Sequence, residues 1–330
     1  MSGTKATPLA SAPVAAPTVD FLLDGQSAQA FAGESILKAA QRHGVDIPHL
    51  CYSDGLRADG NCRACVVEID GERSLAPSCC RNVTAGMQVK AQSPRALKSQ
   101  AMVVEMLLSD MPEVGYKWND SGATKGAAVT SGAAAPGDAP GSSSRSSISS
   151  PGASPGTAGS GASIVVRQHG ELSEWASCMG ISVRPALKAL RRAQPASDVS
   201  HPAMAVNLDA CIQCNRCVRA CREEQVNGVI GYAHRGAHSA IVFDLGDAMG
   251  SSSCVACGEC VQACPTGALM PKTQIGSQAV DKKVDSVCPF CGVGCLITYN
   301  VKDNEIVSVD GRDGPANHGR LCVKGRFGFD

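Results

Sequence analysis

The chain has 330 residues, and its 30 Lys and Arg side chains balance 30 Asp and Glu side chains. This balance gives no reason to expect nucleic acid or an anionic membrane as a partner. The sequence contains no run of about 18 apolar residues, which is the length needed to span a bilayer. The 18 Cys residues would suggest disulfides only in a short secreted scaffold, and the N-terminus lacks the apolar core of a signal peptide. We therefore expect metal-bound thiolates in a reducing cytoplasm.

Residues 1–17 are rich in Ala and Pro and predict a disordered leader, and residues 18–112 predict a compact α+β domain. Its first hairpin is indicated by alternating apolar residues from Val19 to Leu23 before an Asp24-Gly25 turn. The further predicted elements are a helix over 36–43, a second hairpin formed by 66–69 and 74–76, a closing strand at 87–89 and a helix over 96–109.

The rest of the chain divides by composition. Residues 113–163 consist largely of Gly, Ala, Ser, Pro and Thr and predict a flexible linker, because so little apolar surface cannot offset the entropy of ordering. Residues 164–201 predict a helical segment, with a short helical stretch over 171–192. A second Cys-rich block spans 202–273, a polar joint spans 274–285, and a third block spans 286–330.

The strongest pattern is an internal repeat of four cysteines in the second block, in which the fourth Cys of each run is expected to ligate the other cluster, as in bacterial ferredoxins. The pattern predicts two 4Fe–4S centres. Their expected ligands are the Cys211 set (Cys211, Cys214, Cys217, Cys264) and the Cys254 set (Cys254, Cys257, Cys260, Cys221). A pair of zinc sites is the alternative, but zinc motifs seldom place four Cys so closely twice.

Two further groups of four cysteines flank this repeat, and zinc is an alternative occupant of both. In the first block the gaps are 10, 2 and 13 residues, and Gly60, Asn61 and Arg63 surround the central loop, where backbone N–H groups would serve cluster sulfur. The expected ligands of a 2Fe–2S centre are the Cys51 set (Cys51, Cys62, Cys65, Cys79), and those of a third 4Fe–4S centre are the Cys288 set (Cys288, Cys291, Cys295, Cys322).

Several residues near these groups leave alternatives open. Cys80 competes with Cys79 for the fourth place in the first block, and Cys178 is expected to be a small buried residue. His169 with Cys178 is a candidate remnant of a ligand pair, with solvated surface as the alternative. Four arginines are expected to compensate the charge of anionic centres: Arg63, Arg216, Arg219 and Arg222. No nucleotide fingerprint, Ser/His/Asp set or paired-carboxylate motif stands out.

These motifs resemble a known family. Residues 49–52, 60–65 and 77–79 resemble the 2Fe–2S domain of complex I large iron–sulfur subunits, NAD-reducing hydrogenases and NAD-linked formate dehydrogenases, and 207–269 resembles their double-cluster domain. Residues 287–295 and 319–325 resemble the opening of a molybdopterin-dependent formate dehydrogenase. The order of modules resembles the alpha subunit of a cytoplasmic NAD-dependent formate dehydrogenase. The implied folds are a β-grasp 2Fe–2S domain, a double-cluster ferredoxin-like domain and the start of a molybdopterin oxidoreductase domain.

The resemblance also implies a function. In such an enzyme formate is oxidised at molybdenum or tungsten on a bis-pterin guanine dinucleotide, and electrons pass through the clusters to a flavin subunit that reduces NAD, with Lys324 between cluster and pterin. An extra centre with one His and three Cys ligands is expected to be absent. The catalytic metal site would lie beyond residue 330, so we interpret the chain as a fragment, with a natural short electron carrier as the alternative. Rival hypotheses are a respiratory or hydrogenase conduit and a zinc-stabilised interaction module.

Overall fold

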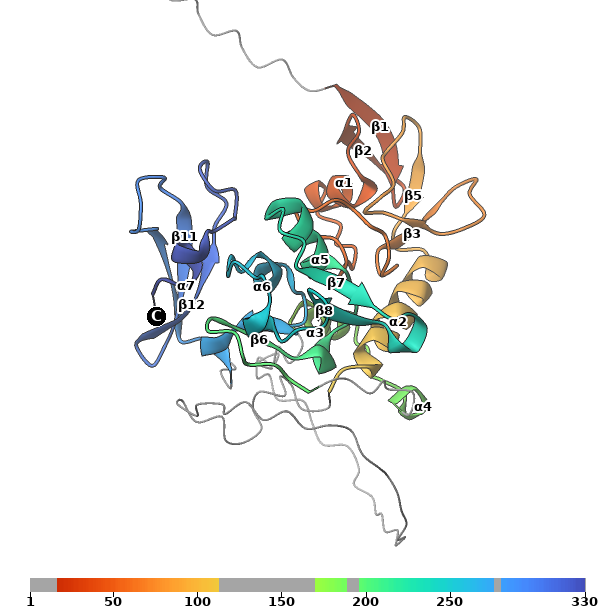
Figure 1. Cartoon of the computed structure of the whole chain (residues 1–330). Coiled ribbons are helices and arrows are strands. Elements are labelled where there is room, and N and C mark those ends of the chain that lie inside the picture. Colours follow the sequence, from red (N-terminus) through yellow and green to blue (C-terminus); the bar gives the residue numbers. More distant parts are fainter. Residues whose placement is uncertain (1–16, 113–169, 189–195, 276–279, 330) are drawn as a thin grey trace, which may run out of the picture.

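The computed structural model describes residues 17–112, 170–188, 196–275 and 280–329. The predicted leader (except residue 17) and the predicted linker lie outside this range. The described part forms three domains in chain order, with the first and third on either side of the second (Figure 1). No helix within the described residues is long and apolar enough to cross a membrane.

The first domain is a five-stranded mixed sheet with one helix against it and a second behind it. Its strands follow the order β2-β1-β5-β3-β4, with β1 and β5 parallel and the other main pairs antiparallel. The strands are β1 Thr18–Leu23, β2 Gln26–Phe31, β3 Val66–Ile69, β4 Ala76–Pro77 and β5 Gln88–Lys90, and the helices are α1 Ile36–Arg42 and α2 Pro94–Ser109. The predicted hairpins, closing strand and helices of this domain are confirmed.

Local sequence explains why these elements begin and turn where they do. Asp24 and Gly25 adopt positive φ angles of 49° and 82°, which a tight β1–β2 turn requires. Ser35 caps α1 by accepting a hydrogen bond from the Lys38 backbone N–H, and Ser93 caps α2 in the same way just before Pro94. The apolar faces of α1 and the sheet share one core.

The helical stretch predicted over 171–192 is divided into two short helices in the described residues. Helix α3 covers Gly170–Cys178, and α4 covers Pro185–Lys188. Gly180 follows α3 with a φ of 62°, the left-handed conformation that ends many helices. Pro185 then starts α4, because proline is tolerated in a first turn but not in a helix interior. Residues 189–192 lie outside the described residues.

The second domain contains two short antiparallel ribbons and the helices that carry the cysteine loops. The strands are β6 Met204–Val206 paired with β9 Leu269–Pro271, and β7 Ile230–Ala233 paired with β8 Ala240–Phe243. The helices are α5 Arg216–Arg219, the π-helical turn Ala220–Glu224 that follows it directly, and α6 Glu259–Ala263. The ribbons and helices enclose a core into which several cysteines project.

The third domain is a three-stranded antiparallel meander closed by one short helix. Its elements are β10 Lys282–Val287, β11 Leu296–Lys302, β12 Glu305–Gly311 and α7 Val323–Phe327. Strand β10 therefore starts inside the segment expected to be a polar joint. Its side chains are mostly exposed, which explains why its sequence looks like a linker.

Candidate metal centres

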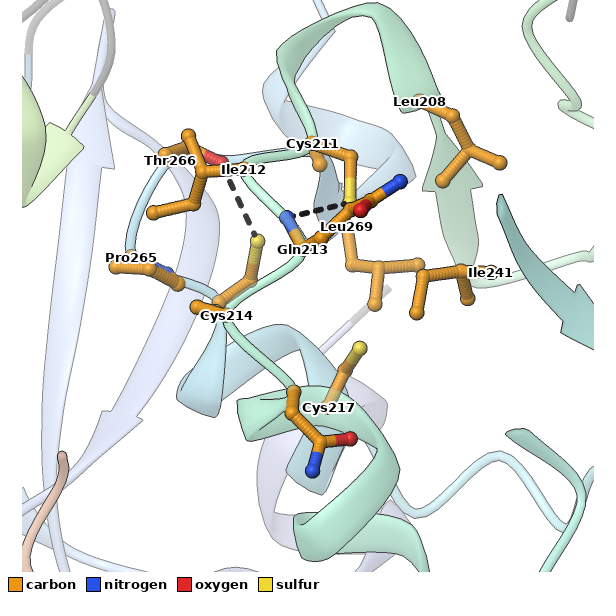
Figure 2. Close-up of a pocket in the computed structure, with 13 residues that line it drawn as sticks. Leu208, Cys211, Ile212, Gln213, Cys214, Cys217, Ile241, Pro265, Thr266 and Leu269 are labelled. Carbon is orange, nitrogen blue, oxygen red and sulfur yellow. Dashed lines mark hydrogen bonds between the residues drawn. The ribbon is translucent and has the colours of Figure 1, made fainter. Parts of the chain in front are cut away.

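The Cys211 set is brought together around one cavity of about 360 Å³ in the second domain. The sulfur atoms of Cys211 and Cys217 point toward one another across this cavity (Figure 2). The remaining wall is mainly apolar and is contributed by Leu208, Ile212, Ile241, Ala268 and Leu269. The cavity thus offers four thiols in mainly apolar surroundings, which suit a sulfur-ligated cluster.

The Cys254 set surrounds a second cavity of about 320 Å³. Cys221 reaches it from the π-helical turn after α5, whereas Cys264 reaches the first cavity from the end of α6. The structure therefore brings together both groups of four that the ferredoxin pattern predicts, including the exchange of the fourth cysteine. Their role as cluster ligands remains a prediction.

The two cysteine loops share one backbone conformation. In the first loop Gln213 and Asn215 have φ angles of 55° and 67°, and in the second Ala256 and Gly258 have 57° and 76°. This left-handed geometry turns backbone N–H groups inward: Gln213 donates to the Cys211 sulfur, and Ala256 donates to the Cys254 sulfur at the same 3.4 Å. Such N–H donors stabilise the anionic sulfur of bound clusters.

Burial controls the protonation of the thiols in these cavities. It raises the pKa of Cys214, and it raises the pKa of Cys217 and Cys260 well above the ordinary value, because a thiolate loses its hydration there. Without a metal these thiols stay protonated at neutral pH. Cluster assembly must therefore displace protons, as metal binding to cysteine does generally.

The Cys51 set converges in the first domain, where Cys51, Cys65 and Cys79 are almost completely buried. Hydrogen bonds from Cys62 and Cys79 lower the pKa of Cys51 to about 2, and a bond from Cys79 lowers that of Cys65 to about 7. Cys80 is exposed, and its sulfur lies 3.6 Å from that of Cys79. The buried group therefore contains Cys79, which the spacing favoured, while Cys80 lies at its edge.

A buried hydroxyl beside this group has no partner of its own. Ser78 is fully buried, and its Oγ makes no hydrogen bond of normal geometry, although it is close enough to Cys65 to lower the pKa of that thiol. An unpaired buried hydroxyl is costly. A bound cluster would offer it an acceptor, so the residues of this site fit a sulfur-rich cofactor.

The Cys288 set is the most open of the four. Cys288 is buried and Cys295 is half-buried, but Cys291 and Cys322 are exposed. Burial, followed by the nearby thiols of Cys288, Cys291 and Cys322, raises the pKa of Cys295. Lys324 is exposed on α7, two residues after Cys322.

The zinc alternative can be compared with this geometry. Within residues 17–112, 170–188, 196–275 and 280–329, no group of three or more Cys, His, Asp or Glu side chains is arranged to hold a single metal ion. A structural zinc ion requires four ligands in a compact tetrahedron.

One expectation about an individual residue is not met. Cys178 was expected to be buried, but it is exposed at the end of α3, because the buried face of that helix is formed by Leu172 and Ala176. His169, its suggested partner, lies outside the described residues. The charge of Arg216 acts on the thiols of Cys214 and Cys264, as the expected compensation of cluster charge requires. The contacts of Arg219 are with Asp59 and with carbonyls of the first domain.

These two arginines join the first and second domains. Arg219 donates to the carbonyls of Cys51 and Arg57, and Arg216 donates to the Leu50 carbonyl while it pairs with Glu171 at 2.6 Å. Both are buried, at 3% and 4% exposure. This role was missed because nothing in the sequence links residues more than 150 positions apart.

Asn61 completes the same junction. Its side-chain amide donates to the Cys214 carbonyl at 3.3 Å, so a residue next to Cys62 contacts the loop of the Cys211 set directly. Leu50 and Cys51 also share an apolar cluster with Ala210 and Cys214. The Cys51 set therefore lies against the Cys211 set. The Cys211 set and the Cys254 set both belong to the second domain.

Three family models match the chain in the order of its domains. They are a 2Fe–2S iron–sulfur cluster binding domain over residues 16–94, a 4Fe–4S dicluster domain over 210–268 and a molybdopterin oxidoreductase Fe4S4 domain over 281–330. The chain is a three-domain iron–sulfur protein. The predicted order of cluster-binding modules in a mixed α and β structure is thereby confirmed.

Longer proteins resemble this chain over most of its length. One component of an NADH-quinone oxidoreductase of Rhizobium meliloti is 30% identical over 93% of the chain, and the putative formate dehydrogenase YrhE of Bacillus subtilis is 25% identical over 95%. The chain spans 31% of the length of each.

A solved structure of an NAD+-reducing NiFe hydrogenase, in the H2-reduced state, has the same general fold. Its matching chain has a TM-score of 0.56 and 22% identity, and the match covers 80% of this protein and 92% of that chain. At this identity the likeness concerns fold alone.

Proposed function

We propose that the protein is the electron-conducting part of an NAD-linked formate-oxidising enzyme, and that the four cysteine sets hold one 2Fe–2S and three 4Fe–4S clusters. The observation that carries this proposal is the succession of the sets. The third domain contacts the loop of the Cys254 set, and the Cys211 set contacts the first domain. Electrons would follow this succession from the third domain to the first.

The clusters would supply one-electron carriers whose geometry changes little on reduction. The protein's own groups hold and insulate them. Thiols of the four sets bind iron, and backbone N–H groups at Gln213 and Ala256 orient toward sulfur. The apolar walls of the two cavities exclude water.

The formate specificity and the partners are inferred from two matches. The third domain matches a molybdopterin oxidoreductase Fe4S4 domain, and one relative over nearly the whole chain is called a putative formate dehydrogenase. A molybdenum or tungsten centre on a bis-pterin, which we assign to the complete enzyme only, would deliver electrons past Lys324. A flavin subunit that binds NAD would accept them at the first domain.

A second candidate is an electron conduit of a complex I-like NADH dehydrogenase or an NAD-reducing hydrogenase. The 30% identity to a component of an NADH-quinone oxidoreductase favours it. Both candidates require the same four clusters, and they differ in the electron donor.

Cluster content is the first test. The chain, purified anaerobically and reconstituted, is expected to contain about 14 iron atoms and as much labile sulfide, with a 2Fe–2S EPR signal distinct from the 4Fe–4S signals. Stoichiometric zinc without colour would refute the conduit in either form.

The donor is tested in the complex recovered from the native organism through a tag on this protein. Formate that reduces the clusters and drives NAD reduction would support the proposal. Reduction by hydrogen, or by NADH with quinone as acceptor, would overturn the formate assignment in favour of the second candidate.

A further inference from the structure

The third domain is docked on the second through a buried ion pair. Arg326 of α7 lies 3.1 Å from Glu259 of α6, and the two residues are 3% and 4% exposed. The Arg326 Nε also donates to the Cys257 carbonyl at 3.2 Å, and its other terminal contact is the Gln262 side chain. One guanidinium of the third domain is therefore held by three groups of the second.

A second arginine places all three domains in contact. Arg320 binds Glu259 at 2.7 Å and Glu224 at 3.2 Å, and it donates to the Asp54 carbonyl of the first domain at 3.3 Å. Glu259 thus receives one guanidinium on each carboxylate oxygen, both from the third domain. Nothing else among its described contacts offsets its charge.

The packing around the pair leaves no room for a larger side chain at Gly258. A Cβ on Gly258 would lie 2.1 Å from Cδ of Arg326 and 2.9 Å from the ring of Phe327. Phe327 itself packs against the core of the second domain. The charges therefore interact in a region where solvent screening is weak.

The position of Glu259 places this pair beside the Cys254 centre, where it can affect the reduction potential as well as hold the domains together. It lies between Cys257 and Cys260, inside the loop of the Cys254 set. A buried carboxylate next to a cluster disfavours the arrival of an electron, and a neighbouring guanidinium offsets that effect, because net charge is one of the determinants of cluster potential. The guanidinium belongs to the other domain, so the offset exists only while the domains are docked.

We propose that the Glu259–Arg326 pair makes the reduction of the Cys254 centre depend on docking of the third domain. This inference rests on the proposed cluster assignment. With the domain docked, the paired carboxylate leaves the centre able to accept an electron. With the third domain undocked, Glu259 loses both Arg326 and Arg320, and its bare carboxylate favours the oxidised form of the centre. Loss of Arg326 alone leaves Arg320 in place and acts in the same direction.

The test is an EPR-monitored redox titration of the reconstituted chain. Arg326→Gln is expected to shift the reduction equilibrium of the Cys254 centre at least tenfold toward the oxidised form, which is 59 mV for one electron. Glu259→Gln is expected to shift it the opposite way, and the double variant is expected to titrate close to the unmodified protein. Arg326→Lys, which keeps the charge, is expected to restore most of the potential.

Controls separate charge from folding and from the cluster assignment. Arg42→Gln removes an exposed partner of Glu34 in the first domain, and it should leave the Cys254 centre unchanged. If both single variants retain all iron and have the same Cys254-centre potential as the unmodified protein, the inference is overturned and the ion pair is purely structural. Absence of the Cys254 signal from the unmodified protein would instead refute the cluster assignment itself.

Discussion

The first and third domains each hold a set of four thiols, and the surroundings of the two sets differ. In the first, Cys51, Cys65 and Cys79 are at most 2% exposed, and the second domain closes the site through the apolar cluster around Leu50 and Cys214. In the third, two of the four thiols are exposed. A cysteine pattern therefore specifies which thiols meet, while the neighbouring domain determines how well they are sealed.

The open side of the third site is apolar as well as accessible. Phe290, Val293 and Val323 are 44%, 58% and 42% exposed, and each is next to or two residues from a cysteine of the set. The first site is therefore covered by protein, whereas the third site is open. We expect a cluster in the third site to be lost more readily.

The largest expected effect is selective loss of the Cys288 centre. On exposure to air or to a water-soluble iron chelator, the iron content is expected to fall from about 14 to about 10 per chain while the 2Fe–2S signal persists. Oxidants and chelators reach exposed thiolate ligands first. Iron release and EPR, followed over the same time course, measure the order of loss.

The order in which the two centres are lost tests the comparison between the first and third sites. If the 2Fe–2S signal decays first or at the same rate, burial of the Cys51 set does not protect its centre. Cys291→Ser provides the reference state, because it should start with about four iron atoms fewer and show no early phase.

A smaller effect is expected from loosening the third domain at Gly258. Its φ of 76° and the close approach of Arg326 leave no space for a methyl group, so Gly258→Ala should destabilise the docked state by about 1–3 kcal/mol. Thermal unfolding measures this loss, and release of the Cys288 centre should become faster. The matched control is Gly231→Ala, where a Cβ meets nothing within 4 Å and a change within about 0.5 kcal/mol is expected. Equal stability of the two variants would show that the domains are not held at Gly258.

The sequence predicted the elements of the first domain and the grouping of its cysteines because both depend on short-range patterns. Alternation before Asp24-Gly25 gave β1 and its turn, and the spacing of the repeat placed Cys221 and Cys264 in each other's groups. Whether these groups hold clusters is still a prediction that the iron count tests.

What the sequence could not supply depends on long-range packing. The burial of Arg219 against the Cys51 carbonyl joins residues 168 positions apart, and no local pattern encodes such a contact. The break between α3 and α4 was missed because apolar periodicity alone does not show that Gly180 adopts a left-handed conformation. Cys178 was misjudged for the same reason, since helix faces are assigned by tertiary contacts.

The smallest expected effect concerns the closed site and the unpaired hydroxyl of Ser78. If that hydroxyl donates to cluster sulfur, Ser78→Ala should lower the potential of the 2Fe–2S centre by the equivalent of about 1 kcal/mol, because a hydrogen bond to sulfur favours the more negative reduced state. Folding stability should stay level or rise, since a buried hydroxyl without a normal partner is removed. Redox titration and thermal unfolding separate these effects, and exposed Ser74→Ala serves as the control. An unchanged potential with a loss of stability would mean that Ser78 supports the fold alone, and the closed site would then owe its protection to burial without help from this donor.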